Sequence, residues 1–350
     1  MTLLLLLVAF AIILLGAELF TNAIEWVGHE LGLAEGAVGS VLAAVGTALP
    51  ETMIPLVAIV FGAGSRSDAV GVGAILGAPF MLATLAMFVT GLAVLARARR
   101  RGGDDLLAVD PVILGHDIRV FALVYGFAIA VAFLPGGLAV PRWLAAVALI
   151  AAYGWYVRGH LRAEAGEMQA NLAPLRFGRL DRGGSPAPAA PRVRIVVVQL
   201  LAALGAIIGG AVVFVGAVET LARAAGLDET LLALVIAPIA TELPEKLNSV
   251  IWISRGKDTL ALGNITGAMV FQAAVPTSIA LLFASSKWSI GTGSWIAFAS
   301  AGVALASTAL IFIPMIRTGR LHGQRLLVGG ILYAAQLGLV AASLSGAIAA

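Results

Sequence analysis

Long apolar runs alternate with short polar segments along nearly the whole chain. A helix of roughly 20 residues spans a hydrocarbon layer of about 30 Å, and most of the apolar runs approach that length. Dividing the runs at glycine, proline and charged clusters predicts ten membrane-spanning helices. Their approximate ranges are 2–26, 36–61, 68–96, 119–135, 141–158, 194–222, 230–253, 259–284, 290–315 and 324–347.

The runs are too long and too continuous for the strands of a membrane barrel. Helices and closed barrels are the structures that satisfy every backbone hydrogen bond inside lipid, so the pattern predicts an all-α polytopic membrane protein. The first run, residues 2–26, follows no basic residue and has no clear small-residue cleavage site. We therefore expect a first spanning helix there rather than a removable signal peptide.

One long polar segment, residues 159–193, interrupts the pattern. It is rich in charged residues and carries the stretch Gly-Gly-Ser-Pro-Ala-Pro-Ala-Ala-Pro, a composition typical of a hydrophilic linker. This linker divides the chain into residues 1–158 and 194–350, and each part contains five of the predicted spans.

The distribution of basic residues predicts the orientation, because Lys and Arg are retained on the cytoplasmic side of spanning helices. If the N-terminus lies outside, 17 of the 22 Lys and Arg residues face the cytoplasm, four lie outside, and Lys246 falls within the seventh span. We therefore expect both termini to be extracytoplasmic and the linker to be cytoplasmic. The same asymmetry accounts for the net charge of +3 without a nucleic-acid partner.

Composition narrows the classes further, with 60% hydrophobic and 12% charged residues. The absence of cysteine excludes disulfides, thiolate metal sites and cysteine catalysis. The predicted spans hold no nucleophile with a base and no Asp/His metal cluster, so we expect no enzyme activity and no cofactor. Ala-, Gly- and Arg-rich usage indicates a prokaryotic plasma (inner) membrane. Four histidines are expected in loops without metal-binding spacing: His29, His116, His160 and His322.

The chain contains an internal repeat. Gly-Thr-Ala-Leu-Pro-Glu at 46–51 returns 194 residues later as Ala-Thr-Glu-Leu-Pro-Glu at 240–245, and 14 of the 36 pairs between 16–51 and 210–245 are identical. After the next loop the register resumes at an offset of 190 residues. Because each copy has an odd number of spans, the second must enter the membrane from the opposite side. The predicted fold is therefore ten transmembrane helices as two inverted five-helix repeats.

Each copy places one carboxylate inside an apolar run, Glu51 in the first and Glu245 in the second. A charged side chain at the bilayer centre costs on the order of 3 kcal/mol, so two glutamates in the same context indicate function. The alternative is structural hydrogen bonding between packed helices. Thr47 and Thr241 lie four residues before these glutamates and share a helix face with them. We interpret the glutamates and threonines as parts of a cation site.

Helix-breaking prolines add backbone ligands to this interpretation. Pro50 leaves the carbonyl of Gly46 without its helical partner, and Pro244 does the same for Ala240. Hydroxyl, carbonyl and carboxylate oxygens from two opposed helices would form a site that suits hard cations such as Na⁺ or Ca²⁺.

A further charged pair is specific to the second copy. Glu242 lies three residues before Glu245 and four before Lys246, a spacing at which Glu242 and the lysine can pair. With that pair formed, Glu51 and Glu245 would leave the site with a net charge near minus two. A structural role and a role in the site both remain open for this pair. They also remain open for Gln272, which either joins two helices or binds the ion.

These segments resemble the cation/calcium exchanger superfamily, the sodium/calcium exchangers and their relatives. That family carries Gly-Thr-Ser-Leu-Pro-Glu followed by Gly-Asn-x-x-Gly-Ser-Asn in each of two alpha-repeats, which correspond to about 36–91 and 230–284 here. Beside its two Leu-Pro-Glu segments, the chain has Gly-Ala-Ile-Leu-Gly-Ala-Pro at 73–79 and Gly-Asn-Ile-Thr-Gly-Ala-Met at 263–269.

The resemblance implies that Glu51 and Glu245 are the central ligands and that Thr47 and Thr241 flank them. The chain also departs from the family pattern. Alanine replaces serine at three positions, and leucine or glutamine replaces the Asn or Asp of the family: Ala48, Ala78, Ala268, Leu82 and Gln272. Several of the family's oxygen ligands are therefore missing.

Two unpaired carboxylates close together in low dielectric require a bound cation or a proton. If only neutralised states cross between the two faces, the chain is a secondary active antiporter. We expect Ca²⁺ exchange against Na⁺ or H⁺ at a midplane site by alternating access. Two alternatives stay open: a cation-binding sensor or non-transporting homologue, and an exchanger of another divalent cation such as Mg²⁺. The expected partners are inorganic cations and the lipid bilayer. The sequence does not determine the oligomeric state, and a monomer is one of the states that it allows.

Overall fold

The computed structural model describes most of the chain. The described residues are 2–48, 52, 59, 65–135, 138–162, 172–180, 191–224, 242–291 and 294–344. Nearly all of them are helical, and the β-structure in these ranges is one bridge between Leu106 and His322. Eight of the described helices are long and apolar enough to cross a membrane.

The helices of the first half are α1 (Thr2–Glu30), α2 (Glu35–Ala37), the π-helical turn η1 (Val38–Ala43), α4 (Ser65–Met81), the π-helical turn η2 (Leu82–Ala86), α5 (Met87–Arg101), α6 (Pro111–Val131) and α7 (Ala139–Arg162). The remaining elements are the 3₁₀ turn η3 (Arg176–Leu180), α8 (Val193–Ala224), α11 (Leu243–Arg255), α12 (Asp258–Phe283), the 3₁₀ turn η5 (Ser285–Lys287), α13 (Trp295–Thr318), α14 (Gly323–Leu326) and α15 (Val328–Leu344). α2 and η1 belong to one helix, Glu35–Ala48, and α4, η2 and α5 are continuous.

The all-helical prediction is confirmed, and each of the ten predicted ranges overlaps a described helix. Four of those ranges lie partly outside the described residues, so the count of ten spans stays a prediction: 36–61, 230–253, 290–315 and 324–347. The inverted arrangement of two five-helix repeats stays a prediction as well.

The start of the fourth span was placed too late, at 119 instead of Pro111. Asp110 caps α6, because its Oδ1 accepts hydrogen bonds from the backbone N–H groups of Val112 and Ile113 at 2.8 and 3.2 Å. Proline is favoured in the first helical turn. Polar residues in the first turns of α6 concealed this helix start from a hydropathy pattern.

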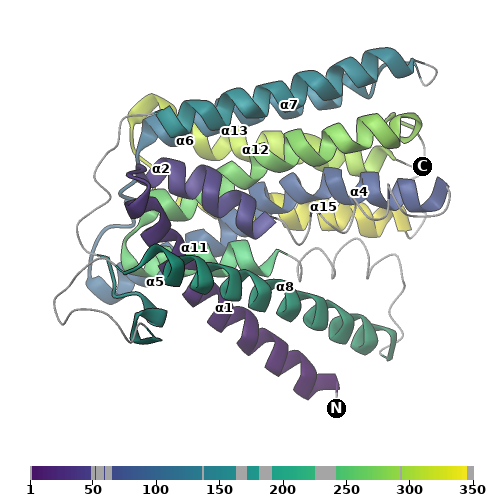
Figure 1. Ribbon diagram of the computed structural model, residues 1–350. Coiled ribbons are helices and arrows are strands. Elements are labelled where there is room, and N and C mark those ends of the chain that lie inside the picture. Colours follow the sequence, from purple (N-terminus) through teal and green to yellow (C-terminus); the bar gives the residue numbers. More distant parts are fainter. Residues whose placement is uncertain are drawn as a thin grey trace.

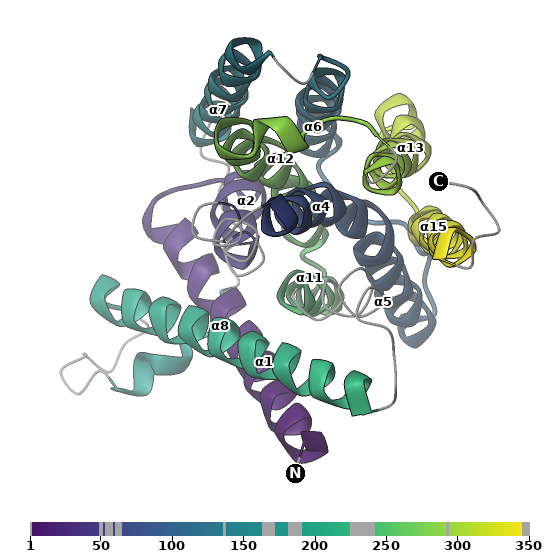
Figure 2. The same cartoon turned by 90° about the vertical axis from the view of Figure 1, so that its right-hand side faces the viewer.

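α12 is the central helix of the bundle. Every residue from Asp258 to Ala274 is buried, so this part of α12 is enclosed by protein on all sides. Seen from one end, it lies among α4, α6, α7 and the Glu35–Ala48 helix (Figure 2). Figure 1 shows α6, α7, α12 and α13 running along the bundle, with α1 beginning at the end where α15 ends.

Glycines on α12 let the π-helical turn η1 approach closely. A Cβ atom at Gly267 would lie only 2.0 Å from the carbonyl oxygen of Ser40, and one at Gly263 would lie 3.0 Å from the Ser40 hydroxyl. Side chains larger than hydrogen would therefore separate η1 from α12. Because η1 leads directly to Thr47, this contact helps to position a candidate site residue.

α1 and α8 cross each other at one side of the bundle (Figure 2). Their contact is reciprocal. A Cβ at Gly16 would lie 2.9 Å from Cγ1 of Ile207, and a Cβ at Gly210 would lie 2.8 Å from Cγ1 of Ile13. The two glycines and the two isoleucines are each 194 residues apart, which is the offset of the sequence repeat. Equivalent residues of the two copies thus make the same contact in both directions.

Charged residues join the helices at the end of the bundle where α12 begins. Arg97 Nη2 donates to Asp258 Oδ2 at 2.8 Å. Lys257 pairs with Glu25, which also accepts a hydrogen bond from Trp252 Nε1 at 2.9 Å. These contacts hold the turn between α11 and α12 against α1 and α5.

Part of the predicted linker packs against the bundle. In η3, the N–H of Arg176 donates to Asn22 Oδ1 at 3.0 Å, and the N–H of Phe177 donates to Gln199 Oε1 at 2.8 Å. The Arg176 guanidinium also pairs with Glu18 at 2.7 Å. This segment therefore has fixed contacts with α1 and α8.

Candidate cation site

α11 places Glu245 in its first turn. The helix begins at Leu243, and Pro244 follows as its second residue, where the missing N–H of proline removes no helical hydrogen bond. A carboxylate is stabilised near the positive end of a helix dipole. Glu245 is fully buried, and neither of its carboxylate oxygens has a hydrogen-bond partner among the described residues. Such a carboxylate is unfavourable unless it binds a cation or a proton.

The turn between α11 and α12 decides which residues lie level with Glu245. Gly256 adopts the left-handed conformation that ends α11, with φ of 78°, and the chain turns back into α12. Ser249 Oγ donates to the Ala261 carbonyl at 3.0 Å, which fixes the register of this helical hairpin. One helical turn further from the hairpin bend, Glu245 lies at about the level of Asn264.

The Glu35–Ala48 helix of the first half reaches the same level. Thr47 Oγ1 lies 3.2 Å from Asn264 Oδ1 and 3.1 Å from the Ala43 carbonyl oxygen. The Thr47 hydroxyl also lies near the Glu245 carboxylate, outside hydrogen-bonding geometry. The site therefore combines side chains from both halves of the chain.

The hydrogen bonds of Thr47 suggest how Asn264 is oriented. Thr47 has one hydroxyl proton, which the Ala43 carbonyl can accept, while Asn264 Nδ2 lacks a partner among the described residues. Rotating the amide by half a turn would let Nδ2 donate to Thr47 Oγ1, and amide O and N atoms are assigned from such networks. In that orientation Asn264 Oδ1 is available as an oxygen ligand.

Two further amides are buried on the same helices. Asn248 follows Glu245 by three residues, is fully buried, and has no partner for Oδ1 or Nδ2 within the described part of the chain. Residues at this spacing are neighbours on a helix surface. Gln272 is also buried, eight residues beyond Asn264 on α12. Carboxamide and carboxylate oxygens are ligands that Ca²⁺ accepts.

The pairing expected between Glu242 and Lys246 is present. Lys246 Nζ lies 2.9 Å from Glu242 Oε2, and both side chains are buried. Because Glu242 balances the charge of Lys246, the lysine does not neutralise Glu245. The charge of Glu245 is therefore available to attract a cation.

Five of the eight residues proposed for the site are described by the structure. Thr47, Glu242 and Glu245 lie together around the start of α11, and Gln272 lies on the adjacent α12. Gly46 packs against an aromatic ring, since a Cβ there would lie 3.1 Å from Phe20 Cζ. The other three residues lie outside the described residues, so their part in the site stays a prediction: Glu51, Thr241 and Ala240.

Sequence reasoning missed Asn248 and Asn264 as candidate ligands. Asn264 stands in the Gly-Asn-x-x-Gly stretch of the second copy, so a signal for it was present. Asn248 gave no such signal, because the equivalent position of the first copy is Ile54. Only the structure shows that the Asn248 amide is buried on α11, three residues after Glu245.

The expectation that all four histidines lie in loops is wrong. His29 lies in α1, His116 in α6 and His160 in α7, while His322 immediately precedes α14. These helices continue past their apolar runs into polar sequence, which hydropathy alone assigns to loops.

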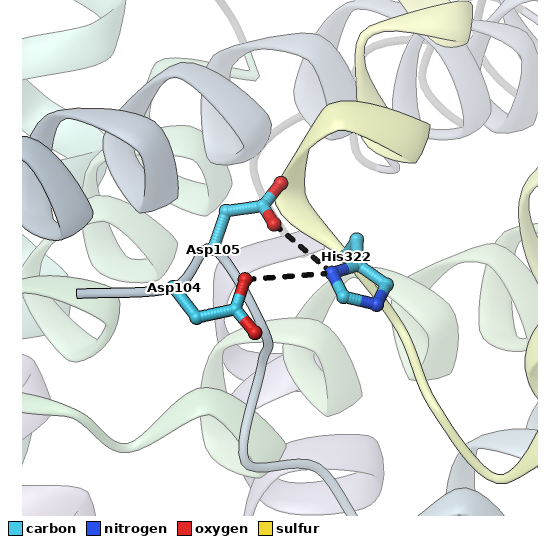
Figure 3. A group of neighbouring side chains, drawn as sticks. All are labelled: Asp104, Asp105 and His322. Atoms are coloured by element: carbon cyan, nitrogen blue, oxygen red, sulfur yellow. Dashed lines mark hydrogen bonds and ion pairs between the residues drawn. The ribbon is translucent and has the colours of Figure 1, made fainter.

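Among the described residues, one group of Asp and His side chains is close enough to hold a metal ion: Asp104, Asp105 and His322 (Figure 3). His322 Nδ1 lies 2.9 Å from Asp105 Oδ1 and 3.8 Å from Asp104 Oδ1. The N–H of Gln324 donates to Asp105 Oδ2 at 3.0 Å. Burial acts to raise the pKa of Asp105, but the bonds from Gln324 and His322 hold it below its usual value.

Asp105 is thus already occupied by donors from the chain, and Asp104 is largely exposed, with 68% of its side chain accessible. We interpret the group as a clamp between the α5–α6 loop and the start of α14 rather than as a metal centre. The backbone bridge between Leu106 and His322 supports this interpretation.

Comparison with known proteins identifies the family of the chain. The chain matches the family described as sodium/calcium exchanger protein over residues 1–160 and 195–342. It belongs to the sodium/calcium exchanger family. This is a family of exchangers rather than of catalytic enzymes. CaxA of Alkalimonas amylolytica, an antiporter by its name, is 30% identical over 145 residues. That match spans 40% of this exchanger-family chain and 43% of CaxA, which is less than half of either protein.

Solved structures of the sodium-calcium exchanger NCX_Mj share the fold of this family member. The form soaked with 100 mM Na⁺ and 10 mM Sr²⁺ has a TM-score of 0.71 and 17% identity, over 96% of this chain and 97% of that one. The form soaked with 2.5 mM Na⁺ and 0.1 mM Ca²⁺ has a TM-score of 0.70 and 16% identity over the same shares. The likeness covers nearly the full length of both chains and concerns their fold.

Proposed function

We propose that this member of the exchanger family is a secondary active cation antiporter, which exchanges Ca²⁺ against Na⁺ or H⁺. The observation that carries the proposal is the Glu245 carboxylate. It is fully buried, has no hydrogen-bond donor among the described residues, and lies at the level of Thr47 and Asn264. A carboxylate in this environment is stable when a cation or proton neutralises it.

The chemistry of the neighbouring groups supports a hard cation. Oxygen atoms of Thr47, Asn248 and Asn264 lie around the start of α11 and on α12, Gln272 is buried further along α12, and no cysteine occurs in the chain. Ca²⁺ takes six to eight oxygen ligands at about 2.3–2.6 Å with flexible geometry, whereas Mg²⁺ requires a strict octahedron. Carboxamides on two separate helices fit the flexible geometry better, so Ca²⁺ is the proposed substrate.

In this proposal Glu51 is the second central ligand. It follows Thr47 by four residues in the sequence, and Thr47 already contacts α12 of the other half. Two carboxylates balance one Ca²⁺ ion. The reciprocal contact of Gly16 and Gly210 supports a symmetric arrangement of the two copies, in which both glutamates approach one midplane site.

Coupling follows from electrostatics. A site with two bare carboxylates is unfavourable inside the bundle, so the loaded or protonated states are the ones that change their exposure between the two faces. Each transport step in one direction then requires an ion for the return step. We propose that this occurs in a prokaryotic inner membrane with both termini outside, as the distribution of basic residues favours.

The direct test is ion flux in liposomes that contain the purified full-length chain. We expect uptake of Ca²⁺ that requires an outward Na⁺ or H⁺ gradient, and loss of at least about 99% of that uptake in Glu245→Gln and in Glu51→Gln. Glu30→Gln is the matched control, because Glu30 lies at the exposed end of α1. Unchanged uptake in the two site variants would overturn the assignment of the site.

A second candidate function is a cation-binding sensor that does not transport. It is favoured by Ala268 and Leu82, which are fully buried at positions where the family carries polar side chains. The same liposomes distinguish the two. Binding of Ca²⁺ that depends on Glu245 but produces no flux under any gradient would favour the sensor, and uptake of Mg²⁺ in preference to Ca²⁺ would change the substrate.

A further inference from the structure

A second buried polar cluster surrounds Asp117 on α6, away from the start of α11. Asp117 is fully buried, and its Oδ2 accepts hydrogen bonds from Ser40 Oγ at 2.7 Å and from Thr266 Oγ1 at 2.6 Å. Its Oδ1 accepts from the Tyr156 hydroxyl at 2.9 Å and lies 3.0 Å from His160 Nε2. This one carboxylate therefore joins α6 to η1, α7 and α12.

The contacts of the His160 ring determine how many protons it shares with Asp117. His160 Nδ1 lies 3.2 Å from the carbonyl oxygen of Tyr156, which can only accept, so this contact is favourable when Nδ1 carries a proton. A neutral imidazole protonated at Nδ1 has a lone pair at Nε2. The ionised Asp117 carboxylate, which faces Nε2, is also an acceptor. Both contacts of the ring are therefore favourable at once only when the pair holds one more proton, on His160 as an imidazolium or on Asp117 as a carboxylic acid.

We propose that Asp117 and His160 form a proton-binding site, separate from the candidate cation site, through which the proton concentration controls transport. Binding of the proton follows from the geometry of the pair, whereas control of transport rests on the proposed function. With the proton bound, all four contacts of Asp117 are favourable. Without it, the lone pair of Nε2 repels the carboxylate, and the Tyr156 hydroxyl is left as the contact of α7 with Asp117.

Two helices connect this proton site to the candidate cation site. Ser40 precedes Thr47 by seven residues on one helix, and Thr266 follows Asn264 by two residues on α12. Thr47 and Asn264 contact each other at the candidate cation site. Because a Cβ at Gly267 would already lie 2.0 Å from the Ser40 carbonyl oxygen, η1 cannot move toward α12 without displacing it. A change at Asp117 is therefore transmitted to both helices.

The other titratable and charged groups that act on the pair come from its own helices. Among the described residues, α6 contributes His116 and Arg119, and α7 contributes Tyr153 beside Tyr156, while η1 and α12 contribute hydroxyl groups. The His116 ring is half-buried, and its centroid lies 5.4 Å from that of His160. His160 is two residues from the end of α7. The pair thus lies near one end of the bundle, beside the half-buried His116 ring.

The first test counts protons on His160 in the unsubstituted, full-length chain in lipid. At about pH 8 a free imidazole is neutral, and ¹⁵N NMR distinguishes protonated from bare ring nitrogens. The chain has four histidines, and His160→Gln assigns the signal of interest by its loss. We expect protons on both nitrogens of His160, or a protonated Asp117 carboxyl band in the infrared spectrum that Asp117→Asn removes. A neutral His160 without that band would overturn the proton site.

The second test measures Ca²⁺ uptake by liposomes as a function of pH. We expect uptake by the unsubstituted chain to change about fivefold or more between about pH 7 and 10, a range that extends above the pH at which the pair still holds its proton, and by less than about twofold in Asp117→Asn and His160→Gln. His29→Gln is the control, since His29 lies at the exposed end of α1, and it should keep the full pH response. The same pH response in all four proteins would overturn the control of transport. Absence of uptake in the unsubstituted chain would overturn the proposed function and this link, whereas the proton count would still decide whether the site exists.

Discussion

Equivalent positions in the two sequence repeats contain different chemistry in the same helical spacing. In the first copy, Thr52 donates its hydroxyl proton to the Ala48 carbonyl at 2.6 Å. In the second copy, 194 residues later, Lys246 Nζ lies 2.9 Å from Glu242 Oε2. All four side chains are buried. One copy thus folds with a small residue and a hydroxyl where the other buries an ion pair.

This difference shows that the repeat fold does not itself require the ion pair. Burying two charges is unfavourable by several kcal/mol per ion, and their mutual attraction often only balances that cost. The pair is therefore a feature of the second copy alone. The pair places Lys246 beside Glu245 with its charge balanced by Glu242. A lysine without such a partner would compete with a bound cation.

The helices that follow these segments also differ in polarity, and again the second copy is the more polar one. Asn264 and Gln272 are buried on α12, whereas the equivalent residues of the first copy, at the offset of 190, are the exposed Ala74 and the buried Leu82. The polar side chains of the candidate site are thus concentrated in the second copy. The first copy contributes Thr47 and, in our proposal, Glu51.

The largest expected loss of stability comes from removing one partner of the ion pair between Glu242 and Lys246. Lys246→Thr leaves Glu242 buried without its partner and should lower the free energy of unfolding by about 3–5 kcal/mol. The double variant Glu242→Ala/Lys246→Thr reproduces the Ala48 and Thr52 arrangement of the first copy and should recover most of that loss. Thermal unfolding in detergent measures both. A double variant as unstable as Lys246→Thr would contradict the comparison of the two copies.

A smaller loss of stability should separate two equivalent glycines. Gly267→Ala would place a methyl group 2.0 Å from the Ser40 carbonyl oxygen, and we expect a loss of about 3 kcal/mol from the forced backbone shift. Gly77→Ala is the matched control in the first copy, where no described atom lies within 4 Å of the new methyl group. It should change stability by no more than about 1 kcal/mol. Equal unfolding temperatures for the two variants would show that η1 is not tightly packed on α12.

The fold was more accessible from sequence than the site. Each of the ten ranges predicted from hydropathy overlaps a described helix, because apolar length is a property of each segment alone. Hydropathy failed at Pro111, because His116, Asp117 and Arg119 interrupt the apolar run near the start of α6. The burial of Asp117 depends on its contacts with η1, α7 and α12. Asn248 and Asp117 were missed for the same reason, since their roles depend on neighbours that are distant in sequence.

Repetition, by contrast, identified Glu245 and Thr47 directly. Two copies of one segment show which polar residues recur, and these two recur as Glu51 and Thr241. Residues present in a single copy give no such signal. Asn264 and the partners of Asp117 belong to that second group, and the structure was needed to bring them together.

Because most candidate ligand residues lie in the second copy, we expect a substitution there to have an effect of intermediate size on Ca²⁺ affinity. Asn264→Ala removes a candidate oxygen ligand and the contact to Thr47, so we expect an apparent Ca²⁺ affinity about tenfold lower, which corresponds to about 1.4 kcal/mol. The reciprocal variant Ala74→Asn adds an amide at an exposed position of the first copy and should leave the affinity unchanged. Concentration dependence of uptake in liposomes measures both. A gain in affinity from Ala74→Asn would show that the two copies share the ligands more equally.

The smallest effect concerns the clamp formed by Asp105 and His322, which joins the two halves of the chain outside the two alpha-repeats. The pKa of Asp105 is lowered in the folded chain, so its stabilising contribution is present above its usual pKa of 3.8 and is lost as the pH falls through the lower, folded-state value. Asp105→Asn should be slightly less stable than the unsubstituted chain at neutral pH, and this difference should vanish in strong acid. Thermal unfolding across that pH range measures it. Asp104→Asn is the exposed control, and a difference that grows in acid would contradict the prediction.

The crossing of α1 and α8 has a consequence for ancestry. Ile207 packs against Gly16, and its counterpart Ile13 packs against Gly210 in the same way. The surface is therefore self-complementary, like the isologous interface of a twofold dimer. Two identical half-length polypeptides, inserted in opposite directions, could form this contact before any linker joined them. Gene fusion would then have joined the halves in one polypeptide in which each half was free to diverge. The first half has the hydroxyl of Thr52, and the second half has the buried amides of Asn264 and Gln272.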